Sequence, residues 1–169
     1  MLKLREIERQ DMVKINKWHN DVKLSQNLGG STRFVNSEVD EAWFDHYLAS
    51  RASNVRCAIL DDNEVVGVVY LLSIDPINLS GELHIMIGEE SSRGKGIGTF
   101  AVHAMVEYAF YNLNLRRIQL DVLETNEAAR SLYRKIGFKD EGMKRKAVYK
   151  NGEYINVIIM ALLREEYRQ

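Results

Sequence analysis

The sequence predicts an α+β fold of three layers, in which helices cover both faces of a mixed, mostly antiparallel sheet. The strongest observation is an apolar run at residues 83–87 that leads into a glycine-rich segment at residues 88–98. A long amphipathic stretch follows at residues 100–115, which gives the order strand, turn, helix. In addition, alternating runs on either side are separated by polar turn clusters, as in the strands of one sheet.

The N-terminal part of the chain is expected to hold one strand and two helices. Residues 2–5 alternate between apolar and charged side chains and predict the first strand. Asp11 is expected to cap a helix over the residues that follow it. Ser37 is expected to cap a second helix, with Asp40 three positions later. The apolar side of that second helix is expected to be Trp43, Phe44, Tyr47 and Leu48.

Six further strands are predicted in the rest of the chain, with turn residues between them. Asn126 is expected to start a short helix that Gly137 stops. The dipeptide Asn151-Gly152 predicts a tight hairpin between the last two strands. The six strands are residues 56–60, 65–72, 82–87, 117–123, 139–149 and 154–163.

The composition fits a single domain over residues 1–169 and excludes several classes of protein. Hydrophobic residues make up 46% of the chain and the formal net charge is -1, so no general attraction to nucleic acid or to an anionic membrane is expected. No apolar run approaches the length of a membrane span, and the N-terminus lacks the apolar core of a signal peptide. Because Cys57 is the only cysteine, no internal disulfide can form, and the reducing cytoplasm is the expected location.

The glycine-rich segment predicts a binding site for a phosphate group. A strand, a glycine turn and a helix bring free N–H groups and the positive end of a helix dipole into one small volume. Arg93 and Lys95 add cationic donors there. A Walker loop would need glycine at Glu89 and a hydroxyl at Gly96, and a dinucleotide fingerprint would need glycine or alanine at Thr99, so neither fits. A plain surface loop is the alternative interpretation.

Three segments together resemble the GNAT superfamily of acyl-CoA-dependent N-acetyltransferases. Residues 93–98 match that family's Gln/Arg-x-x-Gly-x-Gly/Ala loop, residues 120–129 carry its Leu-Asp-Val and Thr-Asn-Glu-Ala-Ala elements, and residues 132–138 resemble its Tyr-x-x-x-Gly-Phe element. All three occur in order and at matching spacing, and a looser similarity extends from Leu2 to Tyr167. Within the superfamily, the chain most resembles the ribosomal-protein alanine, spermidine and amino-sugar N-acetyltransferases.

The resemblance implies a GNAT-like sheet with splayed central strands and acetyl-CoA as the acyl donor. The diphosphate of acetyl-CoA is expected on the loop amides, and its pantetheine arm along the strand that ends at residue 87. Asn126 is expected to bond this arm, to cap its helix, or to do both. The expected coenzyme-binding residues are Met86, Ile87, Gly88, Arg93, Gly94, Lys95, Gly96, Ile97, Gly98, Thr99 and Asn126.

Glu82 and Tyr133 are the expected catalytic residues. Glu82 shares one face of its strand with His84, and because related enzymes place a glutamate on this strand, it is expected to act as the base, through water. The alternative for Glu82 is a solvated carboxylate at the strand end, and for His84 a hydrogen-bonded packing residue. Tyr133 matches the family's acid, which protonates the CoA thiolate, and its alternative is a core tyrosine on an amphipathic helix.

The acceptor is expected to be a primary amine that attacks acetyl-CoA directly in a ternary complex. An amino-sugar nucleotide, a polyamine and a protein N-terminus all remain open. Two other functions also stay open, a non-catalytic acetyl-CoA-binding regulatory module and an unrelated nucleotide-phosphate binder. No metal is expected, since the histidines show no metal-ligand spacing. A homodimer is one expected assembly, because the edge strands of such a domain need covering.

Overall fold

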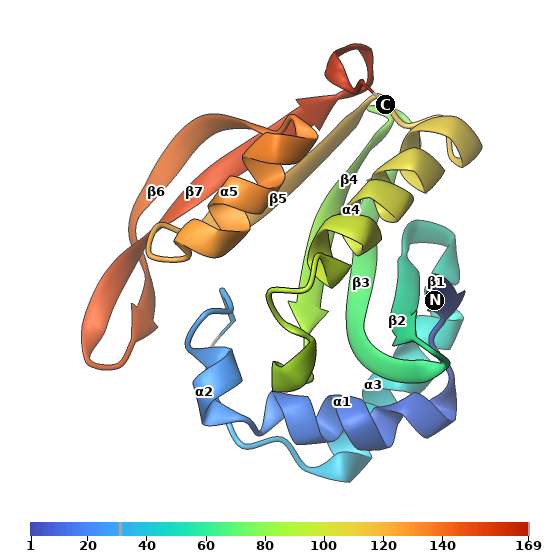
Figure 1. Ribbon diagram of the computed structural model, residues 1–169, viewed down its shortest axis with the longest axis vertical. Coiled ribbons are helices and arrows are strands. Elements are labelled where there is room, and N and C mark those ends of the chain that lie inside the picture. The colour runs from blue at the N-terminus through green and yellow to red at the C-terminus, as the bar shows by residue number, and fades with distance from the viewer. Residues whose placement is uncertain (31, 169) are drawn as a thin grey trace.

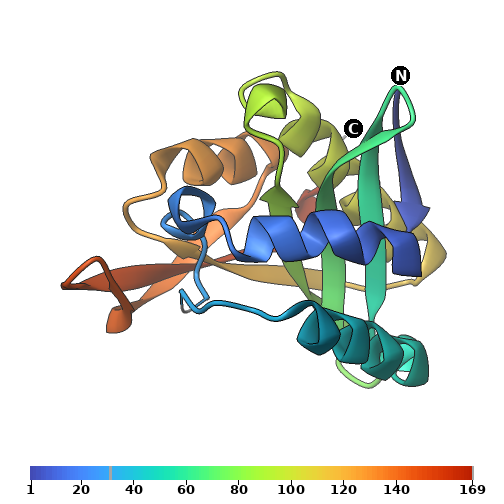
Figure 2. The ribbon, with the colours of Figure 1, turned by 90° about the horizontal axis from the view of Figure 1, so that it is seen from below.

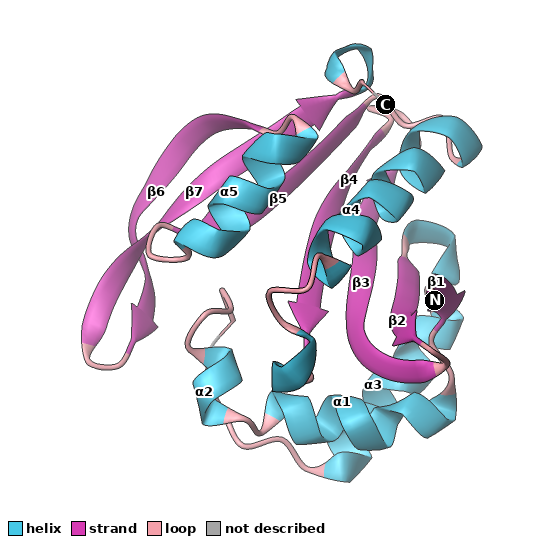
Figure 3. Ribbon diagram, in the orientation of Figure 1, coloured by secondary structure: helices cyan, strands magenta, loops and turns pink. Residues whose placement is uncertain are grey.

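The structure is a computed structural model that describes residues 1–30 and 32–168. It contains a seven-stranded sheet in the order β1-β2-β3-β4-β5-β7-β6 (Figure 3, strands in magenta). Neighbouring strands are antiparallel, except that β4 and β5 run parallel. The strands are β1 (Leu2–Glu6), β2 (Val55–Asp61), β3 (Glu64–Asp75), β4 (Ser80–Ile87), β5 (Arg117–Leu123), β6 (Lys139–Lys150) and β7 (Glu153–Leu163).

Helices cover both faces of this sheet (Figures 1 and 2), so the expected fold class is confirmed. Helices α1 and α3 pack on one face, and α4 and α5 pack on the other. A π-helical turn at Tyr108–Asn112 extends α4. The helices are α1 (Met12–His19), α2 (Val22–Ser25), α3 (Ser37–Ala49), α4 (Ile97–Glu107) and α5 (Glu127–Ile136).

The two faces of the central strand β3 belong to two separate hydrophobic cores. Successive side chains of a strand point to opposite faces. Val69 and Leu71 therefore pack with α4 in the larger core, whereas Val68 packs with α1 and α3 in the smaller one. This double burial explains why β3 is an almost continuous apolar run, and it fixes the position of its neighbour β4.

The two expected caps in the N-terminal part are corrected by the structure. Asn36 caps α3 instead of Ser37, because its side chain accepts a hydrogen bond from the Glu38 N–H at 2.7 Å. Asp11 directly precedes α1 but does not cap it, since its carboxylate accepts from Arg5 at 2.9 Å. A charged partner on β1 outcompetes the helix N–H groups for this buried carboxylate.

Candidate active site

Strands β4 and β5 are paired over only part of their length. Their parallel pairing covers Ser80 to Glu82 opposite Arg117 to Gln119, and the strands then diverge (Figure 1). We call the diverging part the β4–β5 fork, with its narrow end at Glu82 and its mouth where β4 and β5 end. The strand splaying implied by the resemblance is therefore present, and it leaves one edge of β4 free to bond an extended ligand.

The register of β4 decides which of its main-chain groups face the fork. In an antiparallel ladder, the N–H and C=O groups of successive residues point to alternate edges. The Gly88 N–H donates to the Val66 carbonyl at 3.0 Å, so Gly88 and Met86 face β3. Ile87 and Ile85 therefore face the fork. Of the three strand residues expected along a pantetheine arm, only Ile87 presents its main chain to that arm.

Six successive N–H groups lie without a partner where α4 begins. From Gly94 to Thr99, none of these donors finds an acceptor within the described residues, whereas the N–H of Phe100 donates to the Gly96 carbonyl at 3.0 Å. Gly94 and Gly96 have positive φ angles of 74° and 78°, and a Cβ added to either would meet nothing within 4 Å. This open cradle of donors at a helix N-terminus matches the chemistry of a diphosphate.

Arg93 does not point into this cradle. Its Nε donates to the Ile87 carbonyl at 3.1 Å and its Nη2 donates to the Gly88 carbonyl at 2.8 Å. The side chain thus ties the loop to the end of β4, contrary to the expectation of a free cationic donor. Lys95 is exposed beside the cradle and supplies the nearby positive charge instead.

Tyr133 lies on α5 and is only 7% exposed. Its ring packs against Phe138, with ring centres 5.7 Å apart. The preceding residue, Leu132, lies against the start of α4, because a Cβ on Gly98 would be 3.2 Å from its Cδ1. Burial raises the pKa of Tyr133 to about 12, so the phenol is protonated at neutral pH. A protonated hydroxyl has the chemistry of a general acid.

Glu82 and His84 form a pair at the narrow end of the fork. Their Oε1 and Nε2 atoms lie 3.0 Å apart, and both side chains reach solvent. Glu82 is opposite Gln119 in the last pair that β4 makes with β5. A solvent-reaching carboxylate that is hydrogen-bonded to an imidazole can accept a proton through a water molecule.

Asn126 connects α5 to the N-terminal part of the chain. Its Oδ1 accepts from the Ala129 N–H at 3.2 Å, which caps α5, and its Nδ2 donates to the Asn27 carbonyl at 3.1 Å. Asn27 lies in the loop that follows α2. The amide at the mouth of the fork is therefore shared between a helix cap and a long-range contact.

Lys150, which the sequence analysis did not single out, fixes the same loop from the opposite side. It is 3% exposed, and its Nζ donates to the Ser25 carbonyl at 2.8 Å and to the Gly30 carbonyl. Burial lowers the pKa of this ammonium group. A lysine next to a predicted hairpin turn carries no local signal of burial, so only the tertiary structure reveals this contact.

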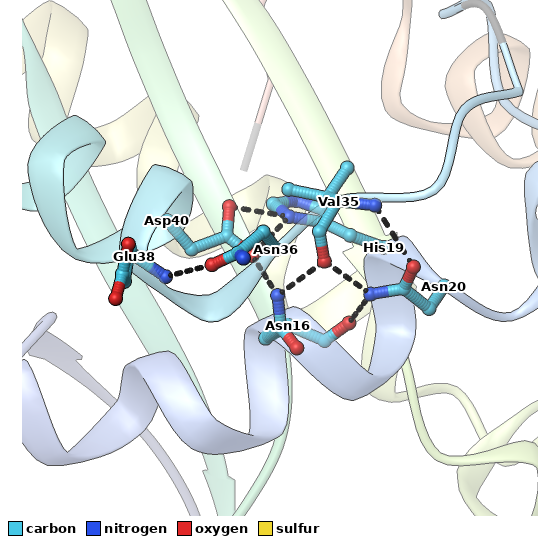
Figure 4. A network of polar contacts seen from close by, with 7 residues as sticks. All are labelled: Asn16, His19, Asn20, Val35, Asn36, Glu38 and Asp40. Atoms are coloured by element: carbon cyan, nitrogen blue, oxygen red, sulfur yellow. Dashed lines mark hydrogen bonds and ion pairs between the residues drawn. The ribbon is translucent and has the colours of Figure 1, made fainter.

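A second network holds the segment before α3 against α1 (Figure 4). Asp40, expected near the cap of α3, is instead buried, where it accepts from Asn16 Nδ2 at 2.8 Å and lies 2.9 Å from His19 Nδ1. The Asn20 side chain bonds both main-chain groups of Val35, at 2.9 Å and 2.8 Å. These contacts fix the polypeptide that leads into α3.

Arg56, which forms no ion pair with a carboxylate of residues 1–30 and 32–168, lies on the same sheet face as Glu82. The Arg56 guanidinium carbon is 4.5 Å from the Trp43 ring centre and 4.8 Å from that of Tyr70. Among the described residues, neither Arg56 Nε nor the Tyr70 hydroxyl, both buried, finds a hydrogen-bond partner. Tyr70 is the cross-strand neighbour of both Arg56 and His84, so the three side chains lie in a row across the sheet. The Arg56 Nε and the Tyr70 hydroxyl of this row remain available for hydrogen bonds to a ligand.

Three further features bear on alternative chemistry. In the described part of the chain, no group of three or more His, Cys, Asp or Glu side chains could hold a metal ion. Burial raises the pKa of the Cys57 thiol to about 11, so it is not a thiolate nucleophile at neutral pH. Within residues 1–30 and 32–168, every helix is too short or too polar to cross a bilayer.

Comparison with known proteins identifies the family to which the chain belongs. A model of the family described as acetyltransferase (GNAT) domain matches residues 1–139. Spermidine N(1)-acetyltransferase of Escherichia coli strain K12 is 30% identical over 166 residues, which covers 98% of this chain and 88% of that protein. A putative ribosomal N-acetyltransferase of Bacillus subtilis is 27% identical over 165 residues, with 98% and 86% covered.

The fold is also found in solved structures. The crystal structure of spermidine N-acetyltransferase from Vibrio cholerae in complex with CoA and spermine matches with a TM-score of 0.92 and 28% identity. The match covers 98% of this chain and 97% of that chain. The resemblance seen in the three motifs is therefore confirmed. The chain belongs to the acetyltransferase (GNAT) family and is an acetyl-CoA-dependent N-acetyltransferase.

Proposed function

We propose that the protein transfers the acetyl group of acetyl-CoA directly to a primary amine, with the cradle, Glu82 and Tyr133 in the roles described below. The observation that carries this proposal is the run of six unpaired N–H groups from Gly94 to Thr99, next to the free edge of β4. These donors would hold the diphosphate, and the Ile87 main chain would bond the pantetheine arm. Asn126 would contribute through the part of its amide that Asn27 does not use.

Glu82 would supply the base for the amine. For an amine with a pKa of about 10.4, deprotonation to the neutral, nucleophilic form at pH 7 costs about 4–5 kcal/mol of free energy. Glu82 would offset part of this by accepting the proton through water, and the hydrogen-bonded His84 would keep the carboxylate oriented toward the narrow end of the fork. The nitrogen lone pair then forms the new C–N bond.

Tyr133 would supply the acid. As the C–S bond breaks, the electron pair stays on sulfur, and the phenol donates its proton to the departing thiolate. The buried phenol is suited to this role because it is fully protonated at neutral pH. Among the described residues no hydrogen-bond partner perturbs this hydroxyl, so the proton is available to a ligand.

The acceptor class is the open part of the proposal. The relatives named for spermidine and for ribosomal substrates support a polyamine or a protein N-terminus, and an amino-sugar nucleotide is the third candidate. A dodecameric structure of the Vibrio cholerae relative supports self-association of this chain, beginning with a homodimer. A single cysteine with a raised pKa suits a reducing cytoplasm.

A two-stage assay tests the proposal. Acetyl-CoA is first titrated into the purified protein, and thiol release is then followed with a panel of amines. Binding followed by amine-dependent release of one thiol per acetylated product is the expected result. Binding without amine-dependent release would support a regulatory module, and competition by ATP in preference to CoA would support a nucleotide-phosphate site.

A further inference from the structure

The twist of the β6–β7 hairpin contains a bulge that carries two adjacent cations. Pairing runs from Lys144 opposite Val157 directly to Val148 opposite Ile155. Three residues of β6, numbers 145–147, therefore face the single residue between Ile155 and Val157 on β7. A bulge of this kind interrupts the ladder and re-aims the side chains that it carries. Here it displaces Arg145 and Lys146.

The bulge is fixed to the mouth of the β4–β5 fork. The Lys146 N–H donates to Asn156 Oδ1 at 2.8 Å, and Lys146 has a positive φ of 52°. Asn156 Nδ2 in turn donates to Glu124 Oε2 at 2.9 Å, and its carbonyl accepts from the Glu124 N–H at 3.0 Å. Since Glu124 directly follows β5, the bulge is held beside the proposed active site.

The surface at this bulge is an open hollow of about 700 Å³ lined by Met143, Arg145, Lys146 and Asn156. We call it the basic hollow, because its lining contains two cations and no acid. Within residues 1–30 and 32–168, neither cation has a carboxylate within 4.0 Å, and Lys146 Nζ only donates to the Tyr154 carbonyl. The adjacent Lys144, by contrast, pairs with Asp121 at 2.5 Å.

We infer that the basic hollow binds a phosphate or diphosphate group of the amine acceptor, an inference that rests on the proposed function. A guanidinium matches phosphate oxygens in a two-pronged geometry, and a lysine adds a point charge. Met143 offers an apolar surface beside them, and the volume is ordinary for a small-molecule site. A polyamine carries the wrong charge for this lining.

The position of the hollow also sets the shape of the acceptor. Its anchor, Glu124, lies five residues along the chain from Gln119, which faces Glu82 at the narrow end of the fork. At the rise of a strand this separation is about 16 Å. The amine and the phosphate must therefore lie at opposite parts of an elongated molecule, which fits a nucleotide-linked amino sugar better than a simple sugar phosphate.

Steady-state kinetics on the full-length protein test this inference. The amine panel contains a uridine-diphosphate-linked amino sugar, glucosamine 6-phosphate, glucosamine and spermidine, at saturating acetyl-CoA. The nucleotide-linked amine is expected to have at least a roughly tenfold higher kcat/KM than the other three. Arg145→Gln and Lys146→Gln should each raise its KM roughly tenfold, as expected for the loss of a charged hydrogen bond, with kcat unchanged.

Lys144→Gln is the matched control, because it removes the same charge from a neighbouring residue whose ammonium group is already paired. Equal effects of all three variants would overturn the inference in favour of net charge alone. A weaker affinity for acetyl-CoA in Arg145→Gln would overturn it by assigning the hollow to the coenzyme. If spermidine is the preferred amine and the variants raise the KM of no amine in the panel, the proposed function stands and the hollow is not an acceptor site. If no amine releases thiol, the proposed function itself fails.

Discussion

The cradle at residues 94–99 and the loop after α2 are held in place in opposite ways, and we propose that this loop lies on the acceptor side of the enzyme. The cradle consists of consecutive residues, and the hydrogen bond from Arg93 that ties it to β4 reaches back only six positions in the chain, to Ile87. The loop after α2 is held instead by Lys150, 125 positions from Ser25, and by Asn126, 99 positions from Asn27. A local site keeps its chemistry when distant parts of the chain change, whereas a site assembled from distant contacts can take a new substrate after few changes.

The two regions touch at Gly88, and Gly88→Ala is expected to have the largest effect. A Cβ at this position would lie 2.0 Å from Cδ2 of Trp18, which is buried on α1. Neither the main chain of β4 nor the buried indole can move away without disturbing its neighbours. We therefore expect a loss of about 3 kcal/mol in the free energy of unfolding, measured by urea denaturation. Affinities for acetyl-CoA and for the acceptor should both fall.

Gly29→Ala is the control for this substitution, since a Cβ there meets nothing within 4 Å. It should leave the denaturation midpoint within experimental error of the wild type. Equal stabilities for Gly88→Ala and Gly29→Ala would show that Trp18 does not bridge the two regions.

Tyr133→Phe is expected to act on the coenzyme side alone. Loss of the acid should lower kcat by roughly ten- to a hundred-fold, while the Kd for acetyl-CoA and the KM for the amine stay unchanged. With its pKa raised to about 12, the phenol stays protonated between pH 7 and 10, so no loss of kcat in that range should come from Tyr133. Stopped-flow thiol release by the wild type and by Tyr133→Phe, recorded from pH 7 to 10, measures kcat and its pH dependence.

The exposed Tyr149→Phe provides the matching control, as it removes the same hydroxyl from the hairpin. Turnover of Tyr133→Phe equal to that of the control would remove Tyr133 from the mechanism.

The difference between the two regions also explains what could be predicted from the sequence. The strand, glycine turn and helix around residues 94–99 are contiguous, so periodicity and glycine positions are enough to predict this arrangement, and a phosphate bound to its N–H groups stays a prediction. The strand register was not predictable, because alternation shows only that side chains change faces. Met86 and Gly88 were therefore grouped with Ile87, although their main-chain groups bond β3.

The tertiary contacts of Asp40, Lys150 and Arg56 could not be predicted for a related reason. Asp40 sits where a helix cap would gain from a carboxylate, but burial beside Asn16 and His19 gives it other partners. Lys150 and Arg56 look like ordinary strand cations, and neither has a sequence neighbour that marks it as buried. Tertiary contacts of this kind override local preference, since each one depends on residues that only the fold brings together.

Lys150→Met has the smallest expected effect and tests most directly how the acceptor side is held. The change keeps an unbranched side chain of similar length but removes the donor to the Ser25 and Gly30 carbonyls, so the loop after α2 should loosen. We expect the KM for the amine to rise about fivefold, as for the loss of about 1 kcal/mol, with an unchanged Kd for acetyl-CoA.

The buried ammonium of Lys150 has a pKa below its ordinary value of 10.5, so the unfolded chain binds more protons than the folded protein between the two pKa values. Wild-type stability should therefore rise as the pH increases toward 10.5, and the variant should lack this rise. The exposed Lys135→Met should match the wild type in both measurements, and a Lys150→Met protein that did the same would show that the loop is held by Asn126 alone.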